Sequence, residues 1–146
     1  MVVAYRGIQQ RARDAQRAQD VKTIAKALEM YYVDNGEFPP GLGTMTGYTS
    51  WSMTADASWD NLRSYLVPKY ISALPVDPTS TPGSPPTSAG SYNYAYYSNT
   101  SSYCGAGVRK MYILVYRREL TQQNELVGDC TTNPLLYAVS NYRVVK

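Results

Sequence analysis

The side chains that most often carry out enzyme chemistry are scarce in this chain. Histidine is absent from its 146 residues. Histidine is the commonest general base, the usual partner of serine and cysteine nucleophiles, and a frequent zinc ligand. Serine, tyrosine and carboxylate side chains are present, but no spacing singles out a catalytic group among them. We therefore expect that the protein is not an enzyme and that it uses no cofactor.

Two cysteines, Cys104 and Cys130, are the remaining chemically distinctive residues. Without histidine, two thiols cannot complete a four-ligand zinc site, and their spacing does not match a C-x-x-C redox motif. We expect them to form a disulfide between the loop before a strand at 111–116 and the loop before a strand at 135–140. A disulfide implies an oxidising compartment outside the cytoplasm. Two unpaired buried thiols are the alternative.

The composition describes a water-soluble globular chain. Charged residues make up 17% of it and hydrophobic residues 44%, and the mean hydropathy is −0.38. Fourteen Lys and Arg against eleven Asp and Glu give a net charge of +3, too small for a dedicated nucleic-acid binder. The length suits one domain, residues 1–146. The longest apolar run, Met111–Tyr116, is far below the ~20 residues of a membrane span.

A long helix is predicted over residues 7–35. Proline is absent there, good helix formers dominate, and Gly36 stands where a left-handed C-terminal cap belongs, shortly before Pro39 and Pro40. The second half of this helix carries an apolar stripe at i, i+3, i+4 and i+7, which indicates packing on a sheet. The helix–sheet core residues that we expect are Val21, Ile24, Leu28, Tyr31 and Tyr32.

The first half of the helix is polar on all sides. Such a helix is not held by core burial, so it projects from the domain or packs on other chains. The charged residues that we expect at an assembly interface between subunits are Arg11, Arg13, Asp14, Arg17 and Asp20. The alternative is pairing within one helix, because Asp14 and Arg17 are at i, i+3.

The rest of the chain divides into a connecting region and a β region. Residues 36–91 are expected to form a connection that is mostly loop, with a short helix at 59–66. Residues 92–146 change to a period of two, which is typical of strands. The expected strands are 92–96, 111–116 and a third at 135–145 that is broken near Asn141. The predicted fold class is α+β: a long N-terminal helix packed on a C-terminal antiparallel sheet of three to four strands.

Two stretches resemble a known family. The first is the helix and its exit, Arg11–Arg17 and Asp20–Pro39. The second comprises Trp59, Leu62 and Tyr70, then Leu74-Pro75-Val76-Asp77-Pro78 followed by Tyr92-Asn93-Tyr94. These segments resemble bacterial type IV pilins and the major pseudopilins of type II secretion. They cover about half of the chain, and the part beyond Tyr97 is assigned by the order of its elements alone.

The resemblance implies a filament subunit rather than an enzyme. Family members are made with a leader and a hydrophobic half-helix, and a prepilin peptidase cuts and methylates them. Here we expect that half-helix to be missing ahead of Val2, and it would be the part that contacts the inner membrane and the assembly machinery. The function expected first is a type IV pilus subunit that self-assembles with other pilins, in adhesion, twitching motility or DNA uptake. Its location is then the inner membrane before assembly and the extracellular pilus afterwards.

Two alternatives remain open from the sequence. One is a major pseudopilin of a type II secretion system, and the other is a minor pilin that binds DNA, with a host surface as a further possible contact. Many major pseudopilins bind calcium through an acidic C-terminal loop, and calcium needs six to eight oxygen ligands. The only carboxylates after Asp77 are Glu119, Glu125 and Asp129, which are not clustered in sequence. The cysteine pair favours a pilin, whereas the Leu74–Pro78 motif favours a pseudopilin.

Overall fold

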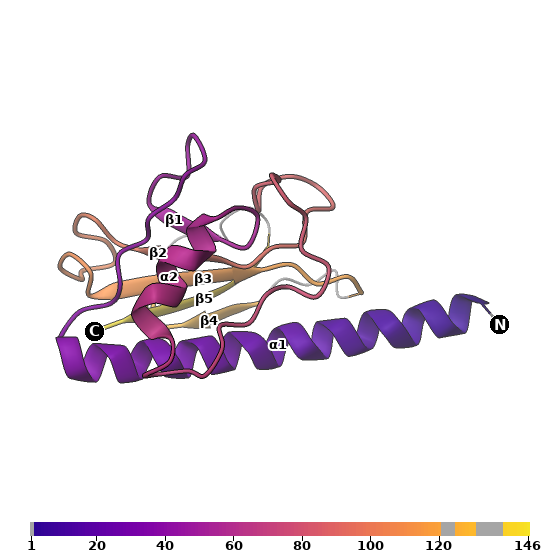
Figure 1. Ribbon diagram of the computed structural model, residues 1–146, viewed down its shortest axis with the longest axis horizontal. Helices are drawn as coiled ribbons and strands as arrows, with labels where there is room; N and C mark the ends of the chain where they lie inside the picture. Colours follow the sequence, from indigo (N-terminus) through magenta and orange to yellow (C-terminus); the bar gives the residue numbers. More distant parts are fainter. Residues whose placement is uncertain (1, 121–124, 131–138) are drawn as a thin grey trace.

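A computed structural model describes residues 2–120, 125–130 and 139–146 (Figure 1). Two helices, α1 (Val2–Asn35) and α2 (Ser58–Leu66), precede most of the sheet. The strands are β1 (Trp51–Met53), β2 (Ala95–Ser98), β3 (Met111–Tyr116), β4 (Leu126–Gly128) and β5 (Ser140–Val145). The predicted α+β class is confirmed, because a long N-terminal helix runs along a sheet that is mostly antiparallel.

The helix α1 is a rod of 34 residues, about 51 Å long at ~1.5 Å per residue. It begins at Val2, five residues before the predicted start. It ends as predicted at Gly36, which takes the left-handed φ of +72° and donates its backbone N–H to the Tyr32 carbonyl at 2.7 Å. Neither described helix is both long and apolar enough to cross a membrane.

The sheet has five strands in the order β1-β2-β3-β5-β4. Neighbouring strands are antiparallel except β4 and β5, which are parallel. The predicted antiparallel sheet of three to four strands thus has five strands instead, and the edge strand β4 departs from the predicted orientation. Both edge strands are only three residues long and pair with residues distant in sequence, so they carry no periodic signal of their own.

The strand boundaries also differ from prediction. The first predicted strand, 92–96, lies at β2, Ala95–Ser98, because Asn93 turns its side chain inward to bond the preceding loop. The segment 36–91 was expected to contain no strand, yet Trp51–Met53 pairs with β2. The third strand is not broken near Asn141, since β5 runs through it in register with β3. The predicted residues 135–138 lie outside the described residues.

The central strand β3 is buried on both faces of the sheet. Tyr112 and Leu114 belong to the cluster that packs against α1 and α2, and Ile113 and Val115 belong to a second cluster on the opposite face. This alternation explains why Met111–Tyr116 reads as a continuous apolar run rather than as an alternating one.

The second half of α1 supplies one wall of the first cluster. Val21, Ile24 and Leu28 are buried in it, and Tyr31 and Tyr32 pack at its margin, partly buried. Val21, Ile24 and Leu28 therefore lie in the core beneath the helix, whereas the Tyr31 ring packs against Tyr65 of α2 and Tyr70, with ring centres 6.1 and 5.4 Å away. The burial holds the C-terminal half of α1 on the sheet and leaves the opposite side of the helix uncovered.

The second cluster is closed by the disulfide. Cys104 and Cys130 are bonded, as predicted, with their Cα atoms 5.9 Å apart. Cys104 lies in the connection between β2 and β3, and Cys130 follows β4 and is buried in the second cluster. The bond therefore joins two segments that cover the sheet face opposite α1.

Removing the disulfide should destabilise the fold without removing α1 from the sheet. A bond that closes a loop with a sequence separation of 26 residues restricts the unfolded chain by about 3–4 kcal/mol in the chain-entropy model. We expect the Cys104→Ser/Cys130→Ser variant to lose about 2–4 kcal/mol of unfolding free energy in urea titrations. Reductant should cause a similar loss in the wild type and none in the variant. Equal stability of variant and wild type would contradict this role.

Candidate assembly helix and its arginine cluster

The first half of α1 carries the charged residues predicted to act in assembly. In Figure 1 the first turns of α1 project beyond the rest of the molecule, whereas the turns that hold residues 13–20 lie beside the sheet and its loops. Side chains on one helix therefore meet two environments. One face contacts the domain, and the other face, with the projecting turns, is open to a partner.

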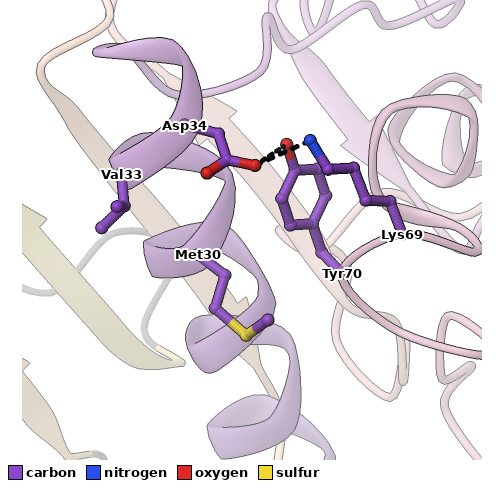
Figure 2. Close-up of a pocket in the computed structure, with 5 residues that line it drawn as sticks. All are labelled: Met30, Val33, Asp34, Lys69 and Tyr70. Carbon is purple, nitrogen blue, oxygen red and sulfur yellow. Dashed lines mark hydrogen bonds and ion pairs between the residues drawn. The ribbon is translucent and has the colours of Figure 1, made fainter.

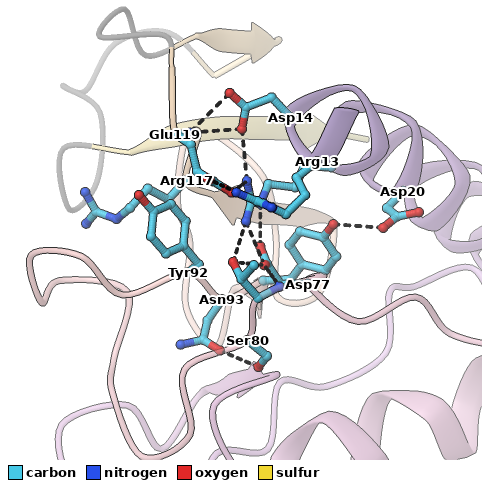
Figure 3. A network of polar contacts seen from close by, with 12 residues as sticks. Arg13, Asp14, Asp20, Asp77, Ser80, Tyr92, Asn93, Arg117 and Glu119 are labelled. Atoms are coloured by element: carbon cyan, nitrogen blue, oxygen red, sulfur yellow. Dashed lines mark hydrogen bonds and ion pairs between the residues drawn. The ribbon is translucent and has the colours of Figure 1, made fainter. Parts of the chain in front are cut away.

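Arg17 is the centre of a buried ionic cluster, and Figure 3 labels its partners Asp14, Asp77 and Glu119. Its Nε and Nη2 donate to the two carboxylate oxygens of Asp77 at 2.8 and 3.0 Å, and both side chains are 0% exposed. Its Nη1 donates to Asp14 at 2.9 Å and to Glu119 at 2.8 Å. The guanidinium also lies over the Tyr92 ring, 4.8 Å from the ring centre. This geometry uses the forked donors of arginine and its flat cationic face at once.

A second guanidinium completes the cluster. Arg13 Nε and Nη2 donate to the two carboxylate oxygens of Glu119, both at 2.6 Å. Asp14 accepts the backbone N–H of Glu119 at 2.9 Å and that of Leu120 at 3.0 Å. The segment that follows β3 is therefore bound to α1 through both side chains and backbone.

The charges of the cluster shift the pKa values of its members. Hydrogen bonds from Arg13 lower the pKa of Glu119 to about 2, against the opposing effect of burial, and Arg17 adds to the lowering. Burial alone would lower the pKa of Arg17, but the hydrogen bonds that Arg17 donates to Asp77 and Glu119 outweigh it and raise that pKa. Glu119 and Arg17 are thus both ionised throughout the neutral range.

Asp20 lies beside the cluster, but its partner is a tyrosine and its pKa shifts in the direction opposite to that of Glu119. Its carboxylate accepts a hydrogen bond from the Tyr94 hydroxyl at 2.8 Å, and burial raises the pKa of Asp20 above the ordinary value. This bond joins α1 to the segment that leads into β2. Asp20 therefore fastens the helix to the domain as well.

The predicted assembly residues accordingly divide into two groups. Arg13, Asp14, Arg17 and Asp20 bond within the chain, and the i, i+3 pair of Asp14 and Arg17 that sequence offered as the alternative is present at 2.9 Å. The expectation that Arg17 meets a neighbouring subunit conflicts with its complete burial. Arg11 is exposed and makes no ion pair in the part of the chain that the structure describes. Contact of this helix with neighbouring subunits remains a prediction, and Arg11 is the residue free to make it.

Sequence reasoning missed the partners of Arg17. Asp77 is 60 residues away and Glu119 is 102 residues away. The one local signal is the Pro75-Val76-Asp77-Pro78 sequence, which places a carboxylate between two prolines that restrict the backbone. It indicates a fixed acid but does not identify the cation.

A comparison with protein families identifies the family of the chain. The family described as "Type II secretion system (T2SS), protein G" matches residues 5–98. The match spans α1, β1, α2 and β2 and includes both Arg17 and Asp77. The chain belongs to this family, the major pseudopilins. Searches of curated proteins and of solved structures found no match to this pseudopilin.

The calcium site of many major pseudopilins does not fit this pseudopilin's late carboxylates. Glu119 accepts from two guanidiniums, Glu125 pairs with Arg118 at 2.7 Å, and Asp129 accepts the backbone N–H of Val145 at 3.4 Å. In the described ranges, no three His, Cys, Asp or Glu side chains gather as metal ligands. These three acids are thus separated and engaged elsewhere, and they do not supply the six to eight oxygens that calcium takes.

Replacing Arg17 tests the importance of the cluster for the fold. Arg17→Met keeps much of the side-chain volume but leaves the Asp77 carboxylate buried without a cation, which typically costs about 3–5 kcal/mol. We expect urea titrations to show that loss. The control Arg11→Met, at an exposed position of the same helix, should change stability by less than about 0.5 kcal/mol.

A second variant separates the buried charge from the loss of packing. Arg17→Met/Asp77→Leu removes both partners, so it should recover a measurable part of the stability lost in Arg17→Met. If the double variant is no more stable than the single one, an uncompensated Asp77 charge is not the cause.

The pKa of Glu119 predicts how stability depends on pH. Its pKa falls from 4.5 to about 2 on folding, so the folded state binds fewer protons. The associated stability, about 2–3 kcal/mol, is complete above about pH 5 and is lost as pH falls toward 2. In Glu119→Gln the free energy of unfolding should be lower at pH 7 and should fall less between pH 5 and 3. The control Glu125→Gln should keep the wild-type profile, and a wild-type profile in Glu119→Gln would contradict the assignment.

Proposed function

We propose that this pseudopilin is a structural subunit of a type II secretion pseudopilus. It assembles with copies of itself and acts by assembly, without catalysis. The match of the protein G family over residues 5–98 carries this proposal. It covers α1 from residue 5 onward, the connecting region and β2.

The attachment of α1 to the domain supports a mechanical role. Three carboxylates and two guanidiniums join the helix to the segments around Asp77 and Glu119, and the apolar face that holds Leu28 continues the contact toward the C-terminal end. A force applied along α1 is then transmitted to the domain through buried bonds rather than through a hinge. A subunit that pushes cargo by growth of a filament requires this rigidity.

The proposed cellular location and partners follow from the family and from the disulfide. A bonded Cys104–Cys130 pair requires an oxidising compartment, so the domain works on the outer side of the inner membrane. The proposed partners are other pseudopilins and the membrane-bound assembly machinery. This proposal assigns the protein no role in twitching motility or adhesion.

A type IV pilus subunit is the second candidate. It is supported by the disulfide that closes the C-terminal region and by the separation of Glu119, Glu125 and Asp129, neither of which is the usual pattern of a calcium-binding major pseudopilin. DNA capture by the helix is less well supported, because Arg13 and Arg17 are already neutralised by carboxylates within the chain.

Deletion of the gene in its own organism distinguishes the two filaments. We expect exoproteins to accumulate in the periplasm and their amount in the medium to fall at least tenfold, while surface pili and twitching remain normal. The wild-type gene should restore secretion, and a gene encoding Arg17→Met should not. Normal secretion together with lost pili would replace the proposed function by the pilus function.

A further inference from the structure

A hollow of about 280 Å³, which we call the edge hollow, lies between α1 and the β4 edge of the sheet. Leu114, Tyr142 and Val127 occupy one row in register across β3, β5 and β4, so their side chains share the sheet face that α1 covers. Exposure rises along this row, from 0% for Leu114, through a partly buried Tyr142, to 42% for Val127. The helix therefore covers the centre of the sheet but not its edge, and this leaves the edge hollow open.

Apolar surface forms the inside of the edge hollow. Val21 and Tyr116 line it and are only 2% and 6% exposed. The rest of its apolar lining is supplied by Ala18, Val127 and Tyr142. Ligand pockets usually measure about 300–1,000 Å³. A space at the lower end of that range suits one apolar side chain.

Three charged side chains line the same hollow, and two of them are cations. Arg118 Nη2 donates to Glu125 at 2.7 Å and to the Tyr116 hydroxyl at 3.2 Å. The other donors of Arg118 and the Nζ of Lys22 bond to nothing else among the residues that the structure describes. The Arg118 side chain is 16% exposed, so water reaches its unused donors only in part. The edge hollow thus joins an apolar space to positively charged donors that remain available.

Glu125 shows which chemical group these donors accept. Its carboxylate already bonds Arg118, yet its side chain is 49% exposed. Ion pairs at exposed positions are weak, because water competes for both partners. A carboxylate from another molecule can therefore join or replace that of Glu125, which acts as a competitor within the chain.

A second hollow beside α1 has a different charge balance. It measures about 270 Å³ and is lined by Met30, Val33, Asp34, Lys69 and Tyr70 (Figure 2). There Asp34 accepts from Lys69 Nζ at 2.7 Å and from the Tyr70 hydroxyl at 3.0 Å. One cation is thus matched by one anion, so this hollow is a control of similar size without surplus charge.

We propose that the edge hollow binds the C-terminal residue of a partner protein, where that residue has an apolar side chain. The side chain fills the space between Val21, Tyr116 and Tyr142. The terminal carboxylate accepts hydrogen bonds from Arg118 and Lys22, and arginine suits this role because its donors match the two oxygens of a carboxylate. This site goes beyond the proposed function, since it requires neither type of filament.

The size of the space favours a chain terminus over an acidic side chain. The hollow holds one side chain, and its cations line the same space, so the apolar group and the carboxylate must be close together. A C-terminal residue carries both groups on one Cα atom. An internal Asp or Glu needs a second residue to supply the apolar group.

NMR titration of the full 146-residue chain with acetyl-Gly-Gly-Phe, which has a free carboxylate, tests the site. We expect saturable shifts of the backbone amides of Ala18, Lys22 and Val127, and none at Met30 or Val33 of the second hollow. The same peptide with a C-terminal amide, and acetyl-Phe-Asp-Gly amide with an internal acid, should each bind at least tenfold more weakly. Absence of saturable shifts at the edge hollow would overturn the site. Equal binding of either control peptide would overturn recognition of the terminal carboxylate.

Charge variants test the donors. Arg118→Gln should weaken binding of acetyl-Gly-Gly-Phe at least tenfold, and Lys22→Gln severalfold. Glu125→Gln should strengthen it severalfold, because it removes the competing carboxylate. Lys69→Gln is the matched control, since it removes the same charge beside the second hollow, and it should leave the affinity unchanged. Equal weakening by Lys69→Gln and Lys22→Gln would reflect net charge alone and would overturn the assignment.

A variant that removes no charge separates binding from folding. Ala18→Met places a larger side chain in the edge hollow and should abolish the shifts, while the urea midpoint stays near that of the wild type. Wild-type affinity in this variant would show that the peptide does not enter the edge hollow, and it would overturn the proposal.

Discussion

The position of α1 depends on the buried ion pair between Arg17 and Asp77. Both side chains are removed from water, which is costly for isolated charges, and the cost is offset only because every donor of the guanidinium finds an oxygen. Because every donor of Arg17 is paired, the cluster constrains the position of α1. Moving α1 along or around its axis would leave Asp77 buried without its cation, whereas apolar contacts tolerate small shifts more easily.

This constraint gives the two faces of α1 different tasks. The inner face first uses charge, around Arg17, and then apolar burial, around Leu28, so the helix is held over two-thirds of its length. The outer face is left with exposed apolar side chains that a solitary domain does not need. The aromatic and apolar residues of β3, together with the disulfide beyond it, provide the rigid body against which the helix is held.

Local patterns predicted the parts of this arrangement that arise locally. The stripe at Val21, Ile24 and Leu28, the cap at Gly36 and the apolar run of β3 follow from periodicity and backbone preference, and each appears where expected. The edge strands β1 and β4 were missed because three residues hold too little pattern and pair across long separations. The charged turn of α1 was predicted to be a free surface because its partners, too, are distant in the sequence. Nothing near Arg17 in the sequence reveals that Asp77 and Glu119 fold back onto it.

Hydrogen exchange of the native protein tests most directly whether the cluster fixes α1 to the domain. The account predicts that backbone amides of the turn around Arg17 exchange nearly as slowly as those at Ile24–Leu28, because both open only with the domain. Amides of the projecting turn around Ile8 should exchange much faster. Exchange around Arg17 that is as fast as exchange around Ile8 would show that the ion pairs do not hold the helix, and it would contradict the account.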